Sequence, residues 1–235
     1  MKKLLCILLL YSAYGYGQQA DTVTSKKVTF KTFVVPATLM AGGLLTQGVI
    51  SRSVRDELVK SYPTFHTSLD NSMQYAPLAL LAGFDAIGLK AKHNVGDQVI
   101  LALLSNGLAQ SITQGLKYTV RYPRPDGEGN ESFPSGHTTM AFTSATLLHQ
   151  EFGQQSVVIS ILGYSAATAT GAMRMLNNRH WLADVLFGAG VGIGSTKVVY
   201  ALYPWIQRKI FKRTNVVALP TYSGSSGGFY VAVVF

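Results

Sequence analysis

Among the polar residues of this sequence, His180 and Asp184 form the pair best suited to covalent chemistry. They are four residues apart, so on a helix they would share one face. A carboxylate that binds one ring nitrogen of a histidine fixes its tautomer and leaves the other nitrogen free to attack an electrophile. The alternative, a surface pair without chemistry, would stabilise the helix by only about 0.2–0.5 kcal/mol. Because an apolar run follows immediately, we favour a buried and functional pair.

A second histidine, His137, ends the segment Pro134-Ser135-Gly136-His137, which comes just before another apolar run. Free backbone N–H groups at the start of a helix bind anions, and Gly136 would allow a close approach of the backbone. Ser135 can donate a hydroxyl hydrogen bond or serve as an N-cap. With a reference pKa of about 6.5, His137 suits a proton donor, and a structural cap is the alternative for a single histidine at this place.

Three basic residues, Lys117, Arg124 and Arg174, flank these histidines in the sequence. Arginine presents a planar fork of donors that matches phosphate oxygens, and lysine adds a compact charge. Lys117 and Arg124 could both point at one anion, and the alternative is a helix end whose basic residues complement the helix dipole. The segments contain no group of several carboxylates that would hold Mg²⁺, so we expect neither a metal ion nor a cofactor. Arg121 and Arg179 are interpreted as solvated surface charges.

The elements that must position these residues are apolar. The chain has 235 residues, of which 48% are hydrophobic and only 13% charged, against about 25% charged in an average soluble domain. This composition indicates a membrane protein or a very apolar helical bundle. The net charge of +9 favours anionic partners. Because the basic residues are scattered between apolar runs, we expect a membrane surface or a phosphorylated substrate rather than nucleic acid.

Six apolar stretches without strict alternation predict an all-α domain of about six helices. Their small residues would let the helices approach closely, as in membrane bundles. Residues 51–75 are polar and residues 122–136 are rich in proline and glycine, so both predict loops, the first with room for a short surface helix. Residues 216–219 and 229–235 predict the two strands of a short C-terminal β-hairpin. The apolar stretches lie near residues 33–50, 76–91, 98–116, 138–150, 156–173 and 183–203.

The N-terminus predicts a secretory signal peptide over residues 1–17. Two lysines precede an apolar run that is shorter than the ~20 residues needed to span a membrane, and an uncleaved anchor is the alternative. The only cysteine, Cys6, lies in this segment, so the mature protein would have neither disulfides nor thiol chemistry. We therefore expect a helical domain over residues 18–214 and a hairpin tail over residues 215–235.

The three polar segments combine into one ordered pattern. It reads Lys, six residues, Arg-Pro; then Pro-Ser-Gly-His; then Arg, five residues, His, three residues, Asp. This pattern resembles the type 2 phosphatidate phosphatase superfamily, which includes bacterial class A acid phosphatases and vanadium haloperoxidases. The resemblance covers the motifs at residues 117–184 and extends over most of residues 33–203. It implies a bundle of apolar helices and a phosphatase that works through a phosphohistidine.

The resemblance also implies a role for each site residue. His180 would attack phosphorus, Asp184 would orient it, and His137 would protonate the leaving oxygen. One departure is that Met173 stands before Arg174, where a serine is usual, so that one hydroxyl donor is lost. The residues that would bind the phosphoryl oxygens are Lys117, Arg124, Ser135, Gly136 and Arg174.

Family members of this shape act on phosphorylated lipids, and the chain looks most similar to lipid A phosphatases, in particular those that remove the 4′-phosphate. The alternatives are an undecaprenyl-diphosphate phosphatase and a non-specific acid phosphatase; a haloperoxidase and a catalytically silent membrane protein are rivals of another kind. We expect a protein of the bacterial cell envelope, associated with the membrane and without an obligate protein partner. Lys90, Lys92 and the basic residues of 208–213 favour a cytoplasmic position for their loops, which places the active site on the periplasmic side. The basic residues of segment 52–60 favour the reverse.

Overall fold

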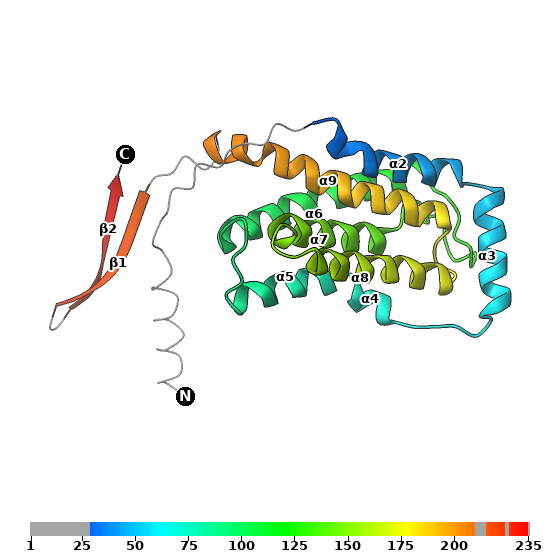
Figure 1. Cartoon of the computed structure of the whole chain (residues 1–235), viewed down its shortest axis with the longest axis horizontal. Helices are drawn as coiled ribbons and strands as arrows, with labels where there is room; N and C mark the ends of the chain where they lie inside the picture. Colours follow the sequence, from blue (N-terminus) through cyan, green and yellow to red (C-terminus); the bar gives the residue numbers. More distant parts are fainter. Residues whose placement is uncertain (1–28, 210–214, 224–225, 235) are drawn as a thin grey trace.

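Eight helices form the body of the protein in this computed structural model, which describes residues 29–209, 215–223 and 226–234. The predicted all-helical body is confirmed, but the described part of the chain has eight helices instead of about six. Figure 1 shows them as one elongated bundle. Their bounds are α2 (Lys31–Leu45), α3 (Val49–Ser61), α4 (Leu69–Met73), α5 (Ala76–Ala86), α6 (Val95–Val120), α7 (Gly136–Phe152), α8 (Val157–Leu176) and α9 (Leu182–Lys209).

The two helices beyond the prediction, α3 and α4, lie in the polar segment 51–75 that was expected to be mainly a loop. A search for apolar runs misses them because charged and polar residues dominate α3 and because α4 is only five residues long. The other six helices coincide with the six apolar stretches of the sequence. The loop predicted over residues 122–136 is also confirmed, since α7 begins at Gly136.

Helices α7 and α9 pack closely at the centre of the bundle, and α7 also contacts α6 and α8. Two glycines of α9 make this approach possible. A Cβ atom added at Gly188 would lie 2.8 Å from the carbonyl oxygen of Ser135, and one added at Gly192 would lie 2.5 Å from that of Thr139. Because real side chains do not tolerate such distances, these glycines bring the start of α9 directly against the start of α7.

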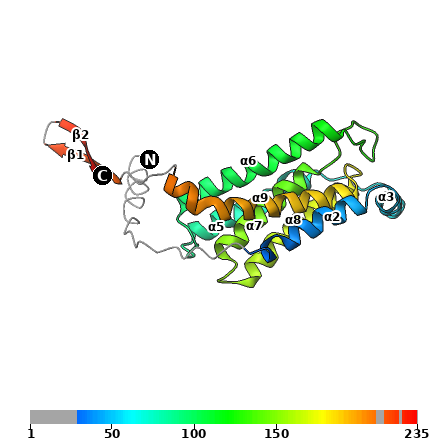
Figure 2. The same ribbon diagram turned by 90° about the horizontal axis from the view of Figure 1, so that it is seen from above.

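Helix α2 packs against another face of α9. At this contact a Cβ atom at Gly190 would lie 2.7 Å from the carbonyl oxygen of Pro36, and one at Gly43 would lie 2.8 Å from the backbone nitrogen of Phe187. Figure 2 shows α2 and α6 on opposite sides of the bundle with α9 between them. The long α9 helix is therefore the element against which most of the others are assembled.

The buried residues of α7 are mainly apolar toward its C-terminus and mainly polar toward its N-terminus. Toward its C-terminus, α7 contributes Leu147, Leu148 and Phe152 to a fully buried apolar cluster. Toward its N-terminus the buried residues are threonines, whose hydroxyls donate hydrogen bonds to backbone carbonyls four residues earlier. These distances are 3.0 Å from Thr139 to Ser135 and 2.8 Å from Thr143 to Thr139. The polar end of the core is the end at which the motif residues lie.

One end of the bundle collects the motif segments. There α6 and α8 end, while α7 and α9 begin. Helix α3 makes an angle of 83° with α2 and lies across the same end in Figure 1. Local signals set these boundaries: Arg121 ends α6 in the left-handed conformation with φ 49°, and the Ser135 side chain caps α7.

Two helices in the described part of the chain, α6 and α9, are long and apolar enough to cross a membrane. The bent pair α2 and α3 would make a third span if its two helices count as one. The expectation of an apolar bundle associated with a membrane agrees with these lengths, whereas the other apolar helices do not meet the same criterion.

The C-terminal residues form two antiparallel strands, β1 (Asn215–Ser223) and β2 (Ser226–Val234), in which Ala218 pairs with Val231. This is the region in which the sequence predicts a hairpin, and its place as a separate tail of the molecule stays a prediction. The proposed signal peptide, residues 1–17, and Cys6 lie outside the described residues.

Candidate active site

The buried pair of His180 and Asp184 is at the centre of the site. His180 Nδ1 lies 3.4 Å from Asp184 Oδ2, and the two residues are 3% and 0% exposed. The same carboxylate oxygen accepts hydrogen bonds from Ser132 Oγ at 2.5 Å and from the backbone N–H of Trp181 at 2.8 Å. These two donors fix the carboxylate, which in turn faces one nitrogen of the imidazole and leaves Nε2 for other partners.

Ser135 joins the start of α7 to this pair. Its backbone N–H donates to the carbonyl oxygen of Asp184 at 3.1 Å. Its side-chain oxygen accepts from the hydroxyl of Thr138 at 2.9 Å and from the backbone N–H of Thr138 at 3.4 Å. Ser135 is thus the N-cap of α7, as one of the two interpretations of the sequence proposed. Gly136 follows as the first residue of α7, where backbone N–H groups lack partners within the helix.

The three basic residues expected to bind phosphate differ in how they are held. Arg174 Nη1 donates to the carboxylate of Asp70 at 2.6 Å, whereas Arg174 Nε is buried and has no hydrogen-bond partner among the described residues. Arg124 Nε is likewise buried without a partner in that part of the chain. Lys117, in the last turn of α6, donates to the carbonyl oxygen of Glu131. Unpartnered buried N–H donors are costly unless a ligand satisfies them, so Arg124 and Arg174 can each offer a donor to an anion.

His137 is half-buried at the start of α7, and its Nε2 lies 2.9 Å from Asn71 Oδ1. The pKa of His137 is lowered from 6.5 to about 4, mainly by burial and also by the positive charges of Arg174 and Lys117, whereas the charge of Asp70 acts in the opposite direction. Charged residues of two other helices, Lys117 of α6 and Arg174 of α8, therefore affect the ionisation of His137 in α7.

Burial also lowers the pKa of His180 from 6.5 to about 4. Asp184 opposes this shift by its hydrogen bond and its charge, whereas the charges of Arg174 and Lys117 add to it. At neutral pH the imidazole of His180 is therefore uncharged and carries a free lone pair, which is the form that a nucleophile needs.

Side-chain contacts join the loop after α6 to the residues just before α9. Trp181 Nε1 donates to the carbonyl oxygen of Pro123 at 2.8 Å and ties the loop after α6 to the start of α9. Arg179 forms ion pairs with Asp126 at 3.1 Å and with Glu128 at 2.7 Å in the same loop. Arg179 is thus engaged in surface ion pairs.

Comparison with known proteins identifies the domain that contains these residues. Residues 98–208 match the PAP2 superfamily, and this region includes all eight residues that the sequence assigns to the site. The chain therefore carries a PAP2 superfamily domain. A protein named lipid A 1-phosphatase from Porphyromonas gingivalis is 38% identical over 178 residues, which are 74% of this chain. The chain spans 38% of the length of that curated relative.

Two solved structures resemble the PAP2 domain and its surroundings. A PAP2-type phosphatidylglycerolphosphate phosphatase from Bacillus subtilis is 22% identical and has a TM-score of 0.53, with 74% of this chain and 98% of that one covered. This likeness shows the shared fold. The LpxE protein of Aquifex aeolicus is 26% identical with a TM-score of 0.47, with 62% of this chain and 93% of that one covered.

Sequence patterns missed three residues that contact the motif side chains of the PAP2 domain. Ser132 binds Asp184, Asp70 binds Arg174, and Asn71 binds His137. Ser132 lies two residues before the Pro-Ser-Gly-His segment, and its nearness to that motif is the one signal that was available. Asp70 and Asn71 lie in a polar segment with no motif, so no local signal pointed to them.

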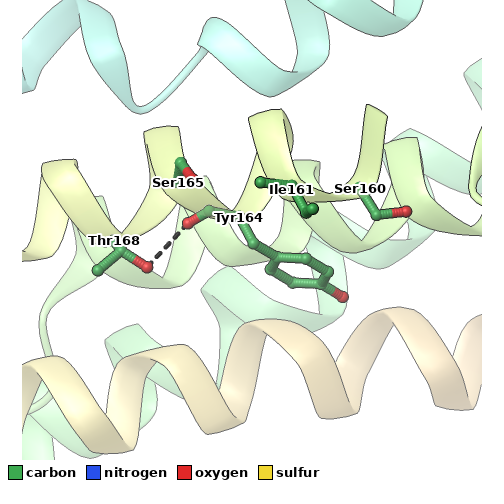
Figure 3. Close-up of a pocket in the computed structure, with 5 residues that line it drawn as sticks. All are labelled: Ser160, Ile161, Tyr164, Ser165 and Thr168. Carbon is green, nitrogen blue, oxygen red and sulfur yellow. Dashed lines mark hydrogen bonds between the residues drawn. The ribbon is translucent and has the colours of Figure 1, made fainter. Parts of the chain in front are cut away.

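The site is distinct from a groove of about 490 Å³ on the surface of α8. Ser160, Tyr164 and Thr168 line this groove, and Thr168 Oγ1 donates a hydrogen bond to the carbonyl oxygen of Tyr164 at 2.8 Å (Figure 3). None of the motif residues of the PAP2 domain lines it. Among the described residues there is also no group of three or more His, Cys, Asp or Glu side chains placed to hold a metal ion.

Proposed function

We propose that this protein is a phosphatase that removes a phosphate from a membrane lipid through a phosphohistidine on His180. The observation that carries the proposal is the buried pair of His180 and Asp184 in contact with Arg174. The backbone N–H of His180 donates to the carbonyl oxygen of Arg174 at 3.3 Å, and Arg174 Nε is buried without a partner among the described residues. A carboxylate that orients a neutral imidazole, beside donors suited to an anion, is the arrangement that nucleophilic attack on a phosphate ester requires.

In the proposed reaction His180 Nε2 attacks phosphorus, and the bond between phosphorus and the lipid oxygen breaks. His137 donates its proton to the departing oxygen, which leaves as an alcohol. A water molecule then attacks the phosphohistidine and gives its proton to His137, the N–P bond breaks, and inorganic phosphate is released. Lys117, Arg124 and Arg174 would neutralise the phosphoryl oxygens in both steps, together with the hydroxyl of Ser135 and the backbone N–H of Gly136.

Substrate binding would reconcile the low pKa of His137 with its role as an acid. In the free protein its pKa is about 4, so the acid form is scarce at neutral pH. A bound phosphate dianion favours the protonated form of a nearby imidazole and raises its pKa. His137 would therefore become protonated when the negatively charged substrate binds.

A phosphorylated lipid is the proposed substrate class because two helices of the domain have the length and composition of membrane spans. Lipid A is our first choice, and the relative named lipid A 1-phosphatase supports it. That name favours the 1-phosphate over the 4′-phosphate expected from the sequence. Undecaprenyl diphosphate and soluble phosphomonoesters remain the competing substrates.

The first experiment compares phosphate release from lipid A by the wild type and by His180→Ala. We expect the substitution to lower kcat by at least about 10³-fold, because the nucleophile is lost. Gln154→Ala, which changes an exposed residue in the turn between α7 and α8, serves as the control and should act as the wild type. Unchanged phosphate release by His180→Ala would refute the catalytic proposal.

Mass spectrometry of cellular lipids with and without the gene separates the candidate substrates. A difference of about 80 Da, the mass of HPO₃, would be confined to one lipid class. Fragment ions of lipid A would assign the loss to the 1- or the 4′-position. A change in isoprenoid phosphates alone would support the undecaprenyl-diphosphate alternative, and faster hydrolysis of p-nitrophenyl phosphate than of any lipid would support an acid phosphatase.

A further inference from the structure

Helix α4 lies outside the matched domain and yet contacts two of the proposed site residues. Its consecutive residues Asp70 and Asn71 bind Arg174 and His137 at 2.6 Å and 2.9 Å. We propose that α4 is a positioning element of the active site, in which Asp70 orients Arg174 and Asn71 orients His137. This inference rests on the proposed phosphatase function, since it assigns partners to the phosphate-binding arginine and to the proton donor of that reaction.

Thr67, just before α4, is held by two hydrogen bonds to the side chain of Asn177. Asn177 accepts a hydrogen bond from the backbone N–H of Thr67 at 2.9 Å and donates one to the carbonyl oxygen of Thr67 at 2.8 Å. Gln74, the C-cap residue of α4, donates to the carbonyl oxygen of Asn71 at 2.8 Å. Because Asn177 directly follows α8, these contacts place α4 in a fixed position beside Arg174, which is in the last turn of that helix.

Asp70 is 1% exposed and is paired with Arg174. Burial by itself would raise the pKa of Asp70, but the hydrogen bond and the charge of Arg174, together with smaller contributions from His137 and Asn177, outweigh this effect and lower the pKa from its ordinary value. Asp70 is therefore ionised at neutral pH. It occupies Nη1 of the guanidinium and leaves Nε without a partner among the described residues. A phosphate oxygen can use that free donor while the carboxylate keeps the planar group in one orientation.

Asn71 contacts His137, the proposed proton donor. Its Oδ1 lies 2.9 Å from His137 Nε2, where a carbonyl oxygen accepts a proton from the imidazole. A hydrogen bond of this kind fixes the ring orientation and favours the form in which Nε2 is protonated. The charged or titratable groups that act on His137 are Asp70 of α4, Arg174 of α8, Lys117 of α6 and His180.

Two isosteric substitutions should shift the pH dependence of kcat in opposite directions. Asn71→Asp places a carboxylate against His137, which favours the protonated imidazole, so the alkaline limb of the pH profile should move up by about one unit. Asp70→Asn removes a negative charge that favours the protonated form, so the same limb should move to lower pH. Asp70→Asn should also lower kcat by roughly tenfold to a hundredfold, because Arg174 loses its fixed orientation.

The profiles are measured with lipid A in detergent micelles, together with the wild type and two controls. Ser72→Ala changes an exposed residue of α4, and Asp85→Asn removes a carboxylate at the other end of the bundle. Both should keep the alkaline limb of the wild type. Size-exclusion chromatography checks folding, and if the buried Asp70→Asn variant fails to fold, the exposed Asn71→Asp variant still decides the question.

A second readout compares leaving groups. Asn71→Ala should lower kcat on lipid A by a larger factor than on p-nitrophenyl phosphate, whose leaving group needs little protonation. The role of α4 would be overturned if the wild type is active, the alkaline limbs of Asn71→Asp and Asp70→Asn are unshifted, and Asn71→Ala loses the same factor in kcat on both substrates. An inactive wild type, or an active His180→Ala variant, would instead refute the proposed function.

Discussion

At the scale of single residues, the site depends on how one carboxylate is held. Asp184 is fully buried, and its Oδ2 accepts from Ser132 and Trp181 while it faces His180. Its other oxygen, Oδ1, is buried without a hydrogen-bond partner among the described residues. The orientation of the proposed nucleophile therefore depends on contacts made by one oxygen atom. Among the described residues, Ser132 is the only one whose side-chain hydroxyl donates to this oxygen.

Ser132→Ala should lower kcat by roughly tenfold or more and change KM little. The variant removes a hydrogen bond to a charged group, which contributes about 1.5–3 kcal/mol, and it leaves the phosphate-binding residues intact. Steady-state kinetics on lipid A measure the effect. Ser144→Ala removes an equally buried hydroxyl of α7 that makes no hydrogen bond in the described structure, and it should leave kcat unchanged. Equal kcat values for the two variants would contradict this role for Ser132.

At the scale of the helices, the distance between α7 and α9 is set by glycine. A methyl group at Gly192 would meet the carbonyl oxygen of Thr139 at 2.5 Å and the backbone nitrogen of Thr143 at 2.8 Å. Both are backbone atoms, so the clash is relieved only when one helix moves. Since His137 lies in the first turn of α7 and Asp184 in the first turn of α9, the same contact sets how these two site residues lie relative to each other.

Gly192→Ala should therefore lower the free energy of unfolding by about 1–3 kcal/mol, because overpacking moves the backbone. Thermal unfolding in one detergent measures the change in Tm. Gly107→Ala in α6 is the matched control, since nothing lies within 4 Å of the added Cβ atom. That variant should be as stable as the wild type or gain up to about 1 kcal/mol from the higher helix propensity of alanine. A Tm for Gly192→Ala that equals that of Gly107→Ala would show that α9 can shift without cost.

At the scale of the whole molecule, all proposed site residues lie at one end of the bundle, and both ends carry basic residues. Near the site, Arg55 pairs with Asp56, and Arg179 pairs with two acidic residues. At the opposite end, Lys90 and Lys92 are exposed in the loop before α6. Because lysine and arginine favour the cytoplasmic side, Lys90 and Lys92 support the proposal that the active site faces the periplasm, whereas the basic residues of segment 52–60 favour the reverse.

Cysteine labelling tests that orientation in a Cys6→Ser background, which removes the only native cysteine. Asn130→Cys lies in the loop near the site, and Gln154→Cys lies in the turn at the other end; both positions are exposed. A membrane-impermeant maleimide should label Asn130→Cys in intact spheroplasts and Gln154→Cys only after lysis. The reverse pattern would place the active site in the cytoplasm.

The apolar helices and the motif residues could be predicted from the sequence because their signals are local. Six long apolar stretches became α2 and α5 to α9, and His180 and Asp184 are near each other because they are four residues apart. The hydrogen bonds of α4 follow no such rule. Asp70 reaches Arg174 across 104 positions of the sequence, and Asn71 reaches His137 across 66. A five-residue polar helix has neither periodicity nor apolar length, so the packing of the bundle, and no pattern in the chain, brings these side chains to the site.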